Sequence, residues 1–272
     1  MAETMKKILF VNSEIYPYLP GTDISRIGRY LPQGTQERKR EIRSFMPRFG
    51  CINERKNQLH EVIRLSGINI VIGDFDCPMV IKVASIPSAR IQFYFIDNED
   101  YFKRKSVYFD ADGKFFSDND ERAIFFAKGV LETVKKQRWA PDIIHCNGWI
   151  SHLVPAYLKK VYKDDPIFSS SKVVLSLYDE LSGVTFPDTF AKKALAGNLS
   201  AEDLPISAEP TGIKLAETAA KYSDAVIFGS PDLDAKLVKY CKGLKVPVLQ
   251  YNAKSLEDGS YIDEYNALYD ML

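Results

Sequence analysis

Residues 141–149 place polar groups directly after a short apolar run. The run predicts a strand, and Gly148 predicts the turn that follows it. Ligands of α/β sheets bind at the carboxyl ends of such strands. A catalytic domain that moves protons would carry ionisable groups there, whereas Asn147 and Gly148 cannot exchange protons near neutral pH. The segment therefore indicates the frame of a catalytic domain without its acid–base chemistry.

Three more polar residues follow strands that the sequence predicts. Tyr178 and Asp179 come after an apolar run over residues 173–177, and Glu14 comes just after a run over residues 8–12. Tyr178 and Asp179 either line a ligand cleft or close a loop, and the sequence favours neither. Glu14 either faces the cleft or caps a neighbouring helix.

Strands and helices alternate along the chain. Apolar runs predict strands over residues 8–12, 68–72, 79–83, 90–96, 142–145, 173–177, 225–228 and 246–250. Helical spacing predicts helices from about Asp118, over residues 151–163 and over residues 212–222, and Asp118 with Glu121 predicts a capping box. This alternation predicts an α/β fold with a doubly wound, mostly parallel sheet.

The C-terminal residues predict a separate small element. Tyr261, Ile262, Tyr265, Leu268 and Leu272 have helical spacing. We expect residues 1–250 to form one Rossmann-like domain and residues 251–272 to form a tail whose helix packs on it.

Composition excludes several classes of protein. Lys+Arg and Asp+Glu are both 36, so the net charge is zero, which argues against nucleic acid as a partner. No apolar run approaches the length of a membrane span, and the N-terminus lacks the apolar segment of a signal peptide. The four cysteines form no CxxC pair, which favours a reducing cytoplasm. We predict no metal and no cofactor, and we expect His60 and His152 near the surface.

Several motifs together resemble one family. They are Ser13-Glu14-Ile15-Tyr16-Pro17, Met46-Pro47-Arg48-Phe49-Gly50, Asp118-Asn119-Asp120-Glu121-Arg122, residues 139–145, Leu153-Val154-Pro155 and Tyr222-Ser223-Asp224. Their order and spacing over residues 7–235 are similar to the bacterial glycogen synthases and plant starch synthases. The resemblance implies the N-terminal half of a GT-B fold, whose two Rossmann-like domains transfer glucose from a nucleotide sugar to an α-glucan.

The departures from the family's pattern concern phosphate binding and proton exchange. The family's Lys-x-Gly-Gly-Leu loop corresponds to residues 20–24, where Pro20 replaces the lysine and Asp23 would repel a diphosphate. An acidic position of the family falls on Arg26, and Asp23 with Arg26 also fits a solvated ion pair. The family's second histidine, which is linked to catalysis, is Asn147 here, and its Val-His-Asn becomes Leu177-Tyr178-Asp179.

The other matched residues have two interpretations each. His145 matches the family's first histidine and either lines the cleft or, as we favour, forms structural hydrogen bonds at the strand end. Trp149 either stacks on a glucan ring or, as we favour, lies in the core or at an interface. Asn147 either holds a sugar hydroxyl or stabilises the turn. The candidates for the cleft are therefore Glu14, Asp23, His145, Asn147, Trp149, Tyr178 and Asp179, and we assign no catalytic residue.

These residues predict a glycogen synthase-like protein of α-glucan metabolism that lacks self-sufficient glucosyl transfer. Its role would be glucan binding, regulation or assembly. The alternative is a half-synthase that transfers glucose from ADP- or UDP-glucose when a partner supplies the C-terminal domain. In either case the partners expected are an α-glucan or a nucleotide sugar, and a protein partner or second copy that covers the GT-B interdomain face.

Overall fold

A computed structural model describes residues 5–272. Its strands are β1 (Lys7–Asn12), β2 (Glu41–Pro47), β3 (His60–Glu61), β4 (Ile68–Ile72), β5 (Phe75–Ile86), β6 (Ile91–Asp97), β7 (Ile143–Asn147), β8 (Lys172–Leu177), β9 (Ala225–Phe228) and β10 (Val248–Leu249). The sheet has the order β10-β9-β8-β7-β1-β2-β6-β5-β3, and β4 pairs with β5 alone. All pairings from β10 to β6 are parallel, whereas those of β5 are antiparallel. The predicted doubly wound, mostly parallel α/β fold is confirmed.

Helices connect and cover the strands. They are α1 (Asp23–Glu37), α2 (Glu99–Phe102), α3 (Asn119–Lys136), α4 (Val154–Lys160), α5 (Phe190–Ala194), α6 (Gly212–Lys221), α7 (Ala235–Gly243), α8 (Ala253–Asp258) and α9 (Tyr261–Asp270). Short 3-10 turns are η1 (Pro87–Ala89), η2 (Trp149–Ser151), η3 (Ala201–Asp203) and η4 (Pro205–Ser207). No helix of residues 5–272 is both long and apolar enough to cross a bilayer.

The central strands form two apolar cores, one on each face of the sheet. Leu9 and Val11 of β1 face the core that α3, α4 and α6 cover. Ile8 and Phe10 of the same strand face the opposite core, which contains residues of α1 and α9. Since successive side chains of a strand point to opposite faces, a strand buried on both sides is mostly apolar, and its few polar side chains, such as His145 and Ser176, form hydrogen bonds. This explains the continuous apolar runs in the sequence.

The structure corrects three local predictions. Asp118 makes no capping hydrogen bond to α3, because its carboxylate pairs with Arg104. The helix expected over residues 151–163 is divided into η2 and α4, with Pro155 in the first turn of α4, where its missing N–H costs little. Helix α1 was not predicted, although Thr22 caps it by accepting a hydrogen bond from the Ser25 N–H.

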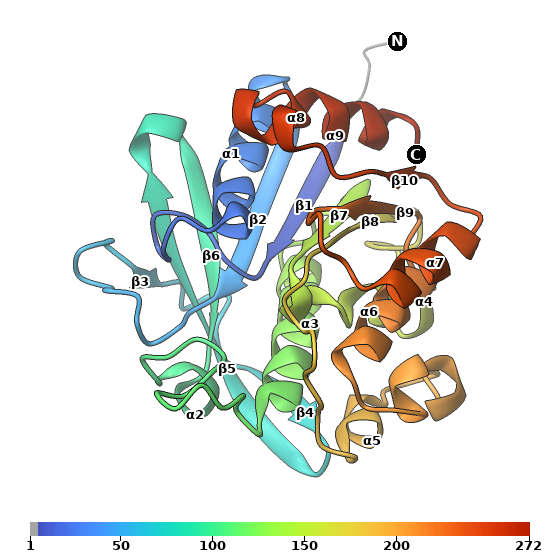
Figure 1. Cartoon of the computed structure of the whole chain (residues 1–272). Helices are drawn as coiled ribbons and strands as arrows, with labels where there is room; N and C mark the ends of the chain where they lie inside the picture. The colour runs from blue at the N-terminus through green and yellow to red at the C-terminus, as the bar shows by residue number, and fades with distance from the viewer. Residues whose placement is uncertain (1–4) are drawn as a thin grey trace.

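The C-terminal helices lie against the N-terminal part of the fold. Figure 1 shows α8 and α9, in red, beside α1, in blue. Tyr265, Leu268 and Tyr269 of α9 are buried in the second core. Arg40 pairs with Asp270 at 2.7 Å, and Arg38, at the end of α1, pairs with Asp263. The division into a domain of residues 1–250 and a tail of residues 251–272 stays a prediction.

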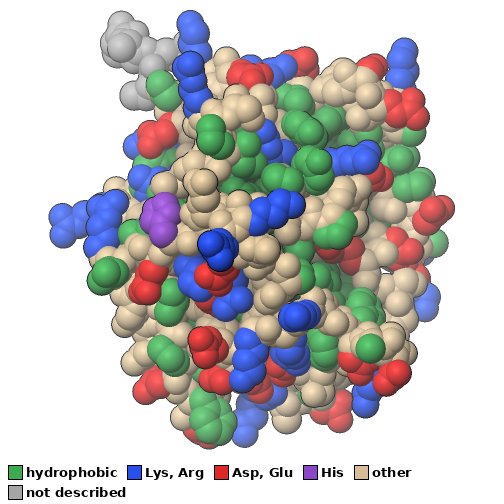
Figure 2. Space-filling model, turned by 90° about the vertical axis from the view of Figure 1, so that its left-hand side faces the viewer, with side chains coloured by type: hydrophobic (Ala, Val, Ile, Leu, Met, Phe, Trp, Pro, Cys, Tyr) green, Lys and Arg blue, Asp and Glu red, His purple; other side chains and the backbone are tan. Residues whose placement is uncertain are grey.

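One face of the surface carries both signs of charge. Figure 2 shows lysine and arginine side chains interspersed with aspartate and glutamate over the side of the molecule that bears β3 and β5. No broad field of positive charge covers that face. The expectation that nucleic acid is not a partner stays a prediction.

Candidate functional site

The strand order reverses between β7 and β1. From β1 the chain crosses to β2 on one side, and β7 leads to β8 on the other. The carboxyl ends of parallel strands at such a reversal border a crevice, because the following loops diverge to opposite faces. Three loops meet there: residues 13–22 after β1, residues 148–153 after β7 and residues 178–189 after β8.

Asn147 lies buried at the carboxyl end of β7, where the strand order reverses. Its side chain is 1% exposed, its Nδ2 donates to Asn12 Oδ1 at 3.1 Å and to the Ile24 carbonyl at 3.3 Å, and its Oδ1 accepts from the Tyr178 hydroxyl at 2.6 Å. The Tyr178 ring lies against Gly229, where a Cβ would come within 2.3 Å of the ring. Since the amide of Asn147 is committed to internal partners, a ligand reaches it only if Tyr178 moves.

Two carboxyl groups follow the carboxyl ends of β1 and β8 and lie close enough for the charge of one to act on the other. Glu14 and Glu180 are both half-buried. Glu14 Oε2 accepts from the Thr22 hydroxyl at 2.6 Å, and Glu180 Oε2 accepts from the Trp149 N–H at 2.9 Å. Burial raises the pKa of Glu180 to about 8, and the charge of Glu14 adds to this shift. Burial also raises the pKa of Glu14, against the hydrogen bond from Thr22. Glu180 is therefore largely protonated at neutral pH and can donate a hydrogen bond.

Glu180 was missed in the sequence. It has no place in the motifs, and Asp179 beside it was taken as the candidate. The structure leaves Asp179 exposed and turns Glu180 toward the β7 loop, where it accepts the Trp149 N–H. A carboxyl three residues beyond the end of β8 was the available signal, but only the fold brings it beside Glu14.

Gly148 and Ser13 pack tightly at the same edge. Gly148 has a φ of +88°, and a Cβ there would lie 2.2 Å from Ser13 Oγ and 3.4 Å from Glu180 Oε1. Only glycine fits this position, for both its backbone angle and its contacts. The Tyr108 hydroxyl lies beside Ser13. Neither oxygen has a hydrogen-bond partner of good geometry within residues 5–272, so buried hydroxyl groups with unused bonding capacity lie next to the carboxyl pair.

The loop before α1 is not built for a diphosphate. Asp23 opens α1 and is exposed, as is Pro20. A carboxylate at a helix N-terminus is stabilised by the helix dipole and occupies the position that favours a phosphate group. The expected Asp23–Arg26 ion pair does not form among the described residues, so the acidic charge of Asp23 is not neutralised there.

His145 and Trp149 do not reach the open part of the crevice. His145 is 0% exposed, with Nδ1 at 2.6 Å from the Tyr269 hydroxyl and Nε2 at 2.7 Å from Ser176 Oγ. Burial lowers the pKa of His145 to about 3, so its ring is neutral. Trp149 is 1% exposed and packs edge-on against Tyr108. Both side chains belong to the core in this conformation.

His152 was predicted near the surface, and this prediction is wrong. Its side chain is 2% exposed, and neither ring nitrogen has a hydrogen-bond partner in the described chain. Burial lowers its pKa to about 3. The loop after β7 turns inward there, so His152 faces Leu181 and Leu237 instead of solvent. His60 is exposed, as expected.

Among the described residues, neither a reactive thiol nor a metal site lies at the crevice. Cys146 is fully buried, and burial raises the pKa of its thiol, so the thiolate is scarce. Within residues 5–272 no group of His, Cys, Asp and Glu side chains is arranged to hold a metal ion.

Comparisons with known proteins identify the fold family. The profile described as the starch synthase catalytic domain matches residues 7–245. The chain belongs to this family. Glycogen synthases of Chlorobium limicola and Chlorobaculum parvum are 38% and 36% identical to this glycogen synthase-like chain, over 74% and 85% of its length. The matches cover 41% and 47% of those relatives, so the chain spans less than half of their length.

A solved structure supports the same assignment. The catalytic domain of starch synthase IV from Arabidopsis thaliana, solved with ADP and acarbose bound, aligns with a TM-score of 0.70. The alignment covers 93% of this chain and 52% of the starch synthase chain, at 14% identity. At that identity the likeness shows the fold alone. The resemblance inferred from the motifs is confirmed.

Proposed function

We propose that this glycogen synthase-like chain binds an α-glucan in the crevice between β1, β7 and β8 and does not transfer glucose by itself. The observation that carries the proposal is the state of Asn147. Where the family has its second histidine, this side chain is an amide, buried and held by Tyr178 and Asn12. It offers neither a proton nor a free hydrogen bond to a reacting sugar.

Two further features support binding without transfer. Pro20 and Asp23 remove the glycine-rich, cationic loop that would stabilise a diphosphate leaving group. Glu14 and Glu180 instead provide paired oxygen atoms that accept hydrogen bonds from sugar hydroxyls, while the protonated Glu180 donates one.

A labelled-donor assay tests the loss of transfer. The purified chain is incubated with glycogen and either labelled ADP-glucose or labelled UDP-glucose. We expect no label in the glucan. Label incorporated by the chain alone, at the rate of an ordinary synthase, would overturn the proposal.

Glucan affinity tests the binding site. We expect the purified chain to bind maltoheptaose, and Glu180→Ala and Glu14→Ala each to weaken binding about 5-fold, because each removes a hydrogen-bonding side chain and a hydrogen bond contributes ~0.5–1.5 kcal/mol. Glu61→Ala is the matched control, since Glu61 is exposed on β3 at the far edge of the sheet. Equal affinities for all these variants would show that the crevice does not bind the glucan.

A second function is favoured by one feature, the burial of the Glu180 carboxyl group near Glu14, which raises its pKa. A carboxyl group with a pKa of about 8 can exchange protons at neutral pH, in the place where ligands of such sheets bind. The alternative is a half-synthase completed by a partner that supplies the donor site. Incorporation of label that needs added cell extract, and that is lost in Glu180→Gln but kept in Asp179→Asn, would favour this alternative.

A further inference from the structure

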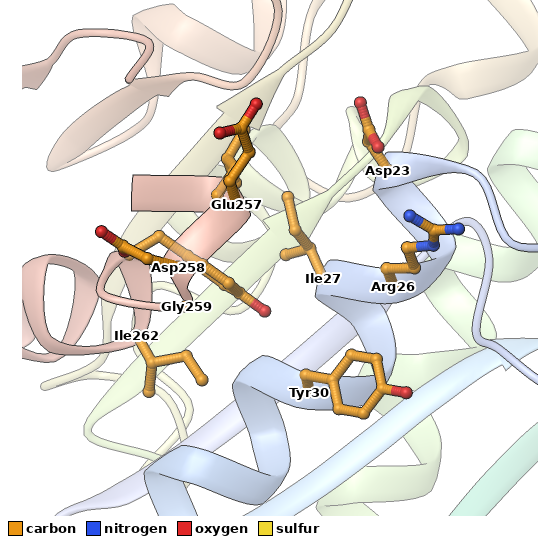
Figure 3. Close-up of a pocket in the computed structure, with 10 residues that line it drawn as sticks. Asp23, Arg26, Ile27, Tyr30, Glu257, Asp258, Gly259 and Ile262 are labelled. Carbon is orange, nitrogen blue, oxygen red and sulfur yellow. The ribbon is translucent and has the colours of Figure 1, made fainter. Parts of the chain in front are cut away.

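A second concave site lies beside α1, and Asn147 does not line it. It has a volume of about 390 Å³, within the ~300–1,000 Å³ typical of small-ligand pockets. Figure 3 shows that one wall comes from α1 and the other from the turn between α8 and α9. The lining residues are Asp23, Arg26, Ile27, Tyr30, Leu256, Glu257, Asp258, Gly259, Tyr261 and Ile262. Of the seven cleft candidates selected from the sequence, Asp23 alone lines this pocket.

The floor and the rim of this pocket differ in chemistry. Ile27, Leu256 and Ile262 provide apolar surface, and the Tyr30 side chain is 45% exposed. The rim carries the carboxylates of Asp23, Glu257 and Asp258 and the guanidinium of Arg26. An aromatic ring that stays exposed beside apolar side chains is a surface on which a flat ligand can pack.

The rim groups keep most of their hydrogen-bonding capacity. Among the described residues, the side chains of Asp23, Arg26 and Glu257 make no ion pair and no hydrogen bond, and Asp258 accepts only from the Ser260 N–H. The rim therefore offers acceptors on both walls and a donor, Arg26, on one. Charged groups left unpaired around a concave apolar floor fit a ligand that supplies both donors and acceptors.

These groups exclude several classes of ligand. A nucleoside diphosphate would place its charge among the carboxylates of Asp23, Glu257 and Asp258, with only Arg26 to offset them. A lipid chain would leave the charged rim unpaired, and burying unpaired charge is costly. A sugar ring has apolar C–H faces and a rim of hydroxyls that both donate and accept. Its chemistry matches the apolar floor and the mixed rim together.

We propose that the pocket between α1 and the α8–α9 turn is a second subsite for glucosyl units of an α-glucan, with Tyr30 as the packing surface and Glu257 and Arg26 as hydrogen-bonding groups. The proposal rests on the proposed glucan-binding function. This second subsite lies partly on the C-terminal helices. A glucan bound between its two walls would therefore hold α8 against α1.

Maltotriose affinity and hydrogen exchange on the full chain test this subsite. We expect Tyr30→Ala and Glu257→Gln each to weaken maltotriose binding by about 5-fold, in the range that a lost hydrogen bond or ring contact gives. Phe75→Ala and Glu202→Gln are matched controls, because Phe75 and Glu202 are exposed residues outside the pocket lining. Maltotriose should also slow amide exchange in residues 253–262 of the wild-type protein.

The possible results separate this inference from the proposed function. If glucan binds, Glu180→Ala weakens it, and Tyr30→Ala and Glu257→Gln do not, the subsite is overturned and the crevice proposal stands. If exchange slows only around residues 147–180, the subsite is overturned as well. Absence of any glucan binding by the wild-type chain would overturn both proposals. Binding of ADP in place of maltotriose, with slowed exchange in residues 253–262, would overturn the assignment of ligand class.

Discussion

Glu180 makes the crevice sensitive to pH. Its pKa is about 8 in the folded protein, against an ordinary value of 4.5. Between these values the folded state binds the proton more tightly than the unfolded state does, so the free energy of unfolding falls as pH rises through this interval. We expect Glu180→Gln, which still accepts from the Trp149 N–H, to remove this slope. At about pH 9 the variant should be ~1–3 kcal/mol more stable, less than the full shift gives because solvent reaches the carboxyl group.

Urea unfolding at a series of pH values between about 5 and 9 measures this slope. Asp179→Asn is the control, since Asp179 is the exposed neighbour and should leave the wild-type slope in place. If wild type and Glu180→Gln lose stability in parallel as the pH rises, Glu180 is not the group that titrates.

At the scale of single residues, the sequence motifs located the strand ends of the crevice but not the side chain with the shifted pKa, Glu180. The residues at the ends of β1, β7 and β8 were found because strand ends can be recognised from apolar runs. The burial of individual side chains could not be predicted from the sequence. His152 was expected at the surface and is buried, and Asn147 is buried and accepts a hydrogen bond from Tyr178. Glu180 was missed because its pKa depends on its burial and on Glu14, which is far away in the sequence.

Helix α9 is held to the sheet by one buried side-chain hydrogen bond. The Tyr269 hydroxyl lies 2.6 Å from His145 Nδ1, and both side chains are 0% exposed. We expect Tyr269→Phe to lower the free energy of unfolding by about 1–3 kcal/mol, because the ring nitrogen would lose its partner in a site that water does not reach. Chemical denaturation measures the change.

Tyr265 provides the matched comparison on the same helix. It is 4% exposed, and its hydroxyl makes no hydrogen bond among the described residues. Tyr265→Phe should therefore change the stability by well under the amount seen for Tyr269→Phe. Equal losses in the two variants would mean that ring packing, and not the bond to His145, secures α9.

The contact between α1 and α9 depends on the absence of a side chain at Gly34. A Cβ there would lie 2.6 Å from Ile262 Cγ2. We expect Gly34→Ala to cost about 1–3 kcal/mol of stability by overpacking, and to speed amide exchange in α9. Gly243→Ala is the control, because nothing lies within 4 Å of its Cβ position; it should be neutral or stabilise α7 by up to ~1 kcal/mol. A Gly34→Ala variant as stable as the wild type would contradict this close packing.

Among the elements, buried strands were easier to predict than helices. Parallel strands are mostly apolar because helices cover both faces of the sheet, so β1, β7, β8 and β9 could be recognised as apolar runs in the sequence. Helix α1 was missed because Pro32, Gly28 and Gly34 interrupt its pattern, and these residues are tolerated only because the helix packs closely on Glu14 and Ile262. Tertiary contacts of this kind cannot be read from local propensity.

At the scale of the whole molecule, the C-terminal helix α9 covers part of one face of the sheet. Tyr261, Tyr265, Leu268 and Tyr269 bury apolar surface over Phe10, Val174 and Ile227. Each buried apolar side chain of this size contributes ~1.5–3 kcal/mol, and a domain is stable by only ~5–15 kcal/mol in total. We expect a chain ending at residue 257 to lose most of its stability and to self-associate through the uncovered face.

Analytical ultracentrifugation and urea unfolding of this truncated chain, beside a chain ending at residue 270, measure both effects. The second truncation removes only Met271, which is 72% exposed, and Leu272, which is partly buried at the edge of the second core, so it should lose far less stability than the first. The truncation exposes an apolar face of the sheet to water. In a solution of the pure protein, the same face of a second copy is the apolar surface available to cover it. A 257-residue chain that stays monomeric and unfolds at the wild-type urea concentration would mean that residues 258–272 do not serve as a cover, and that the face between α1 and β9 is stable in water.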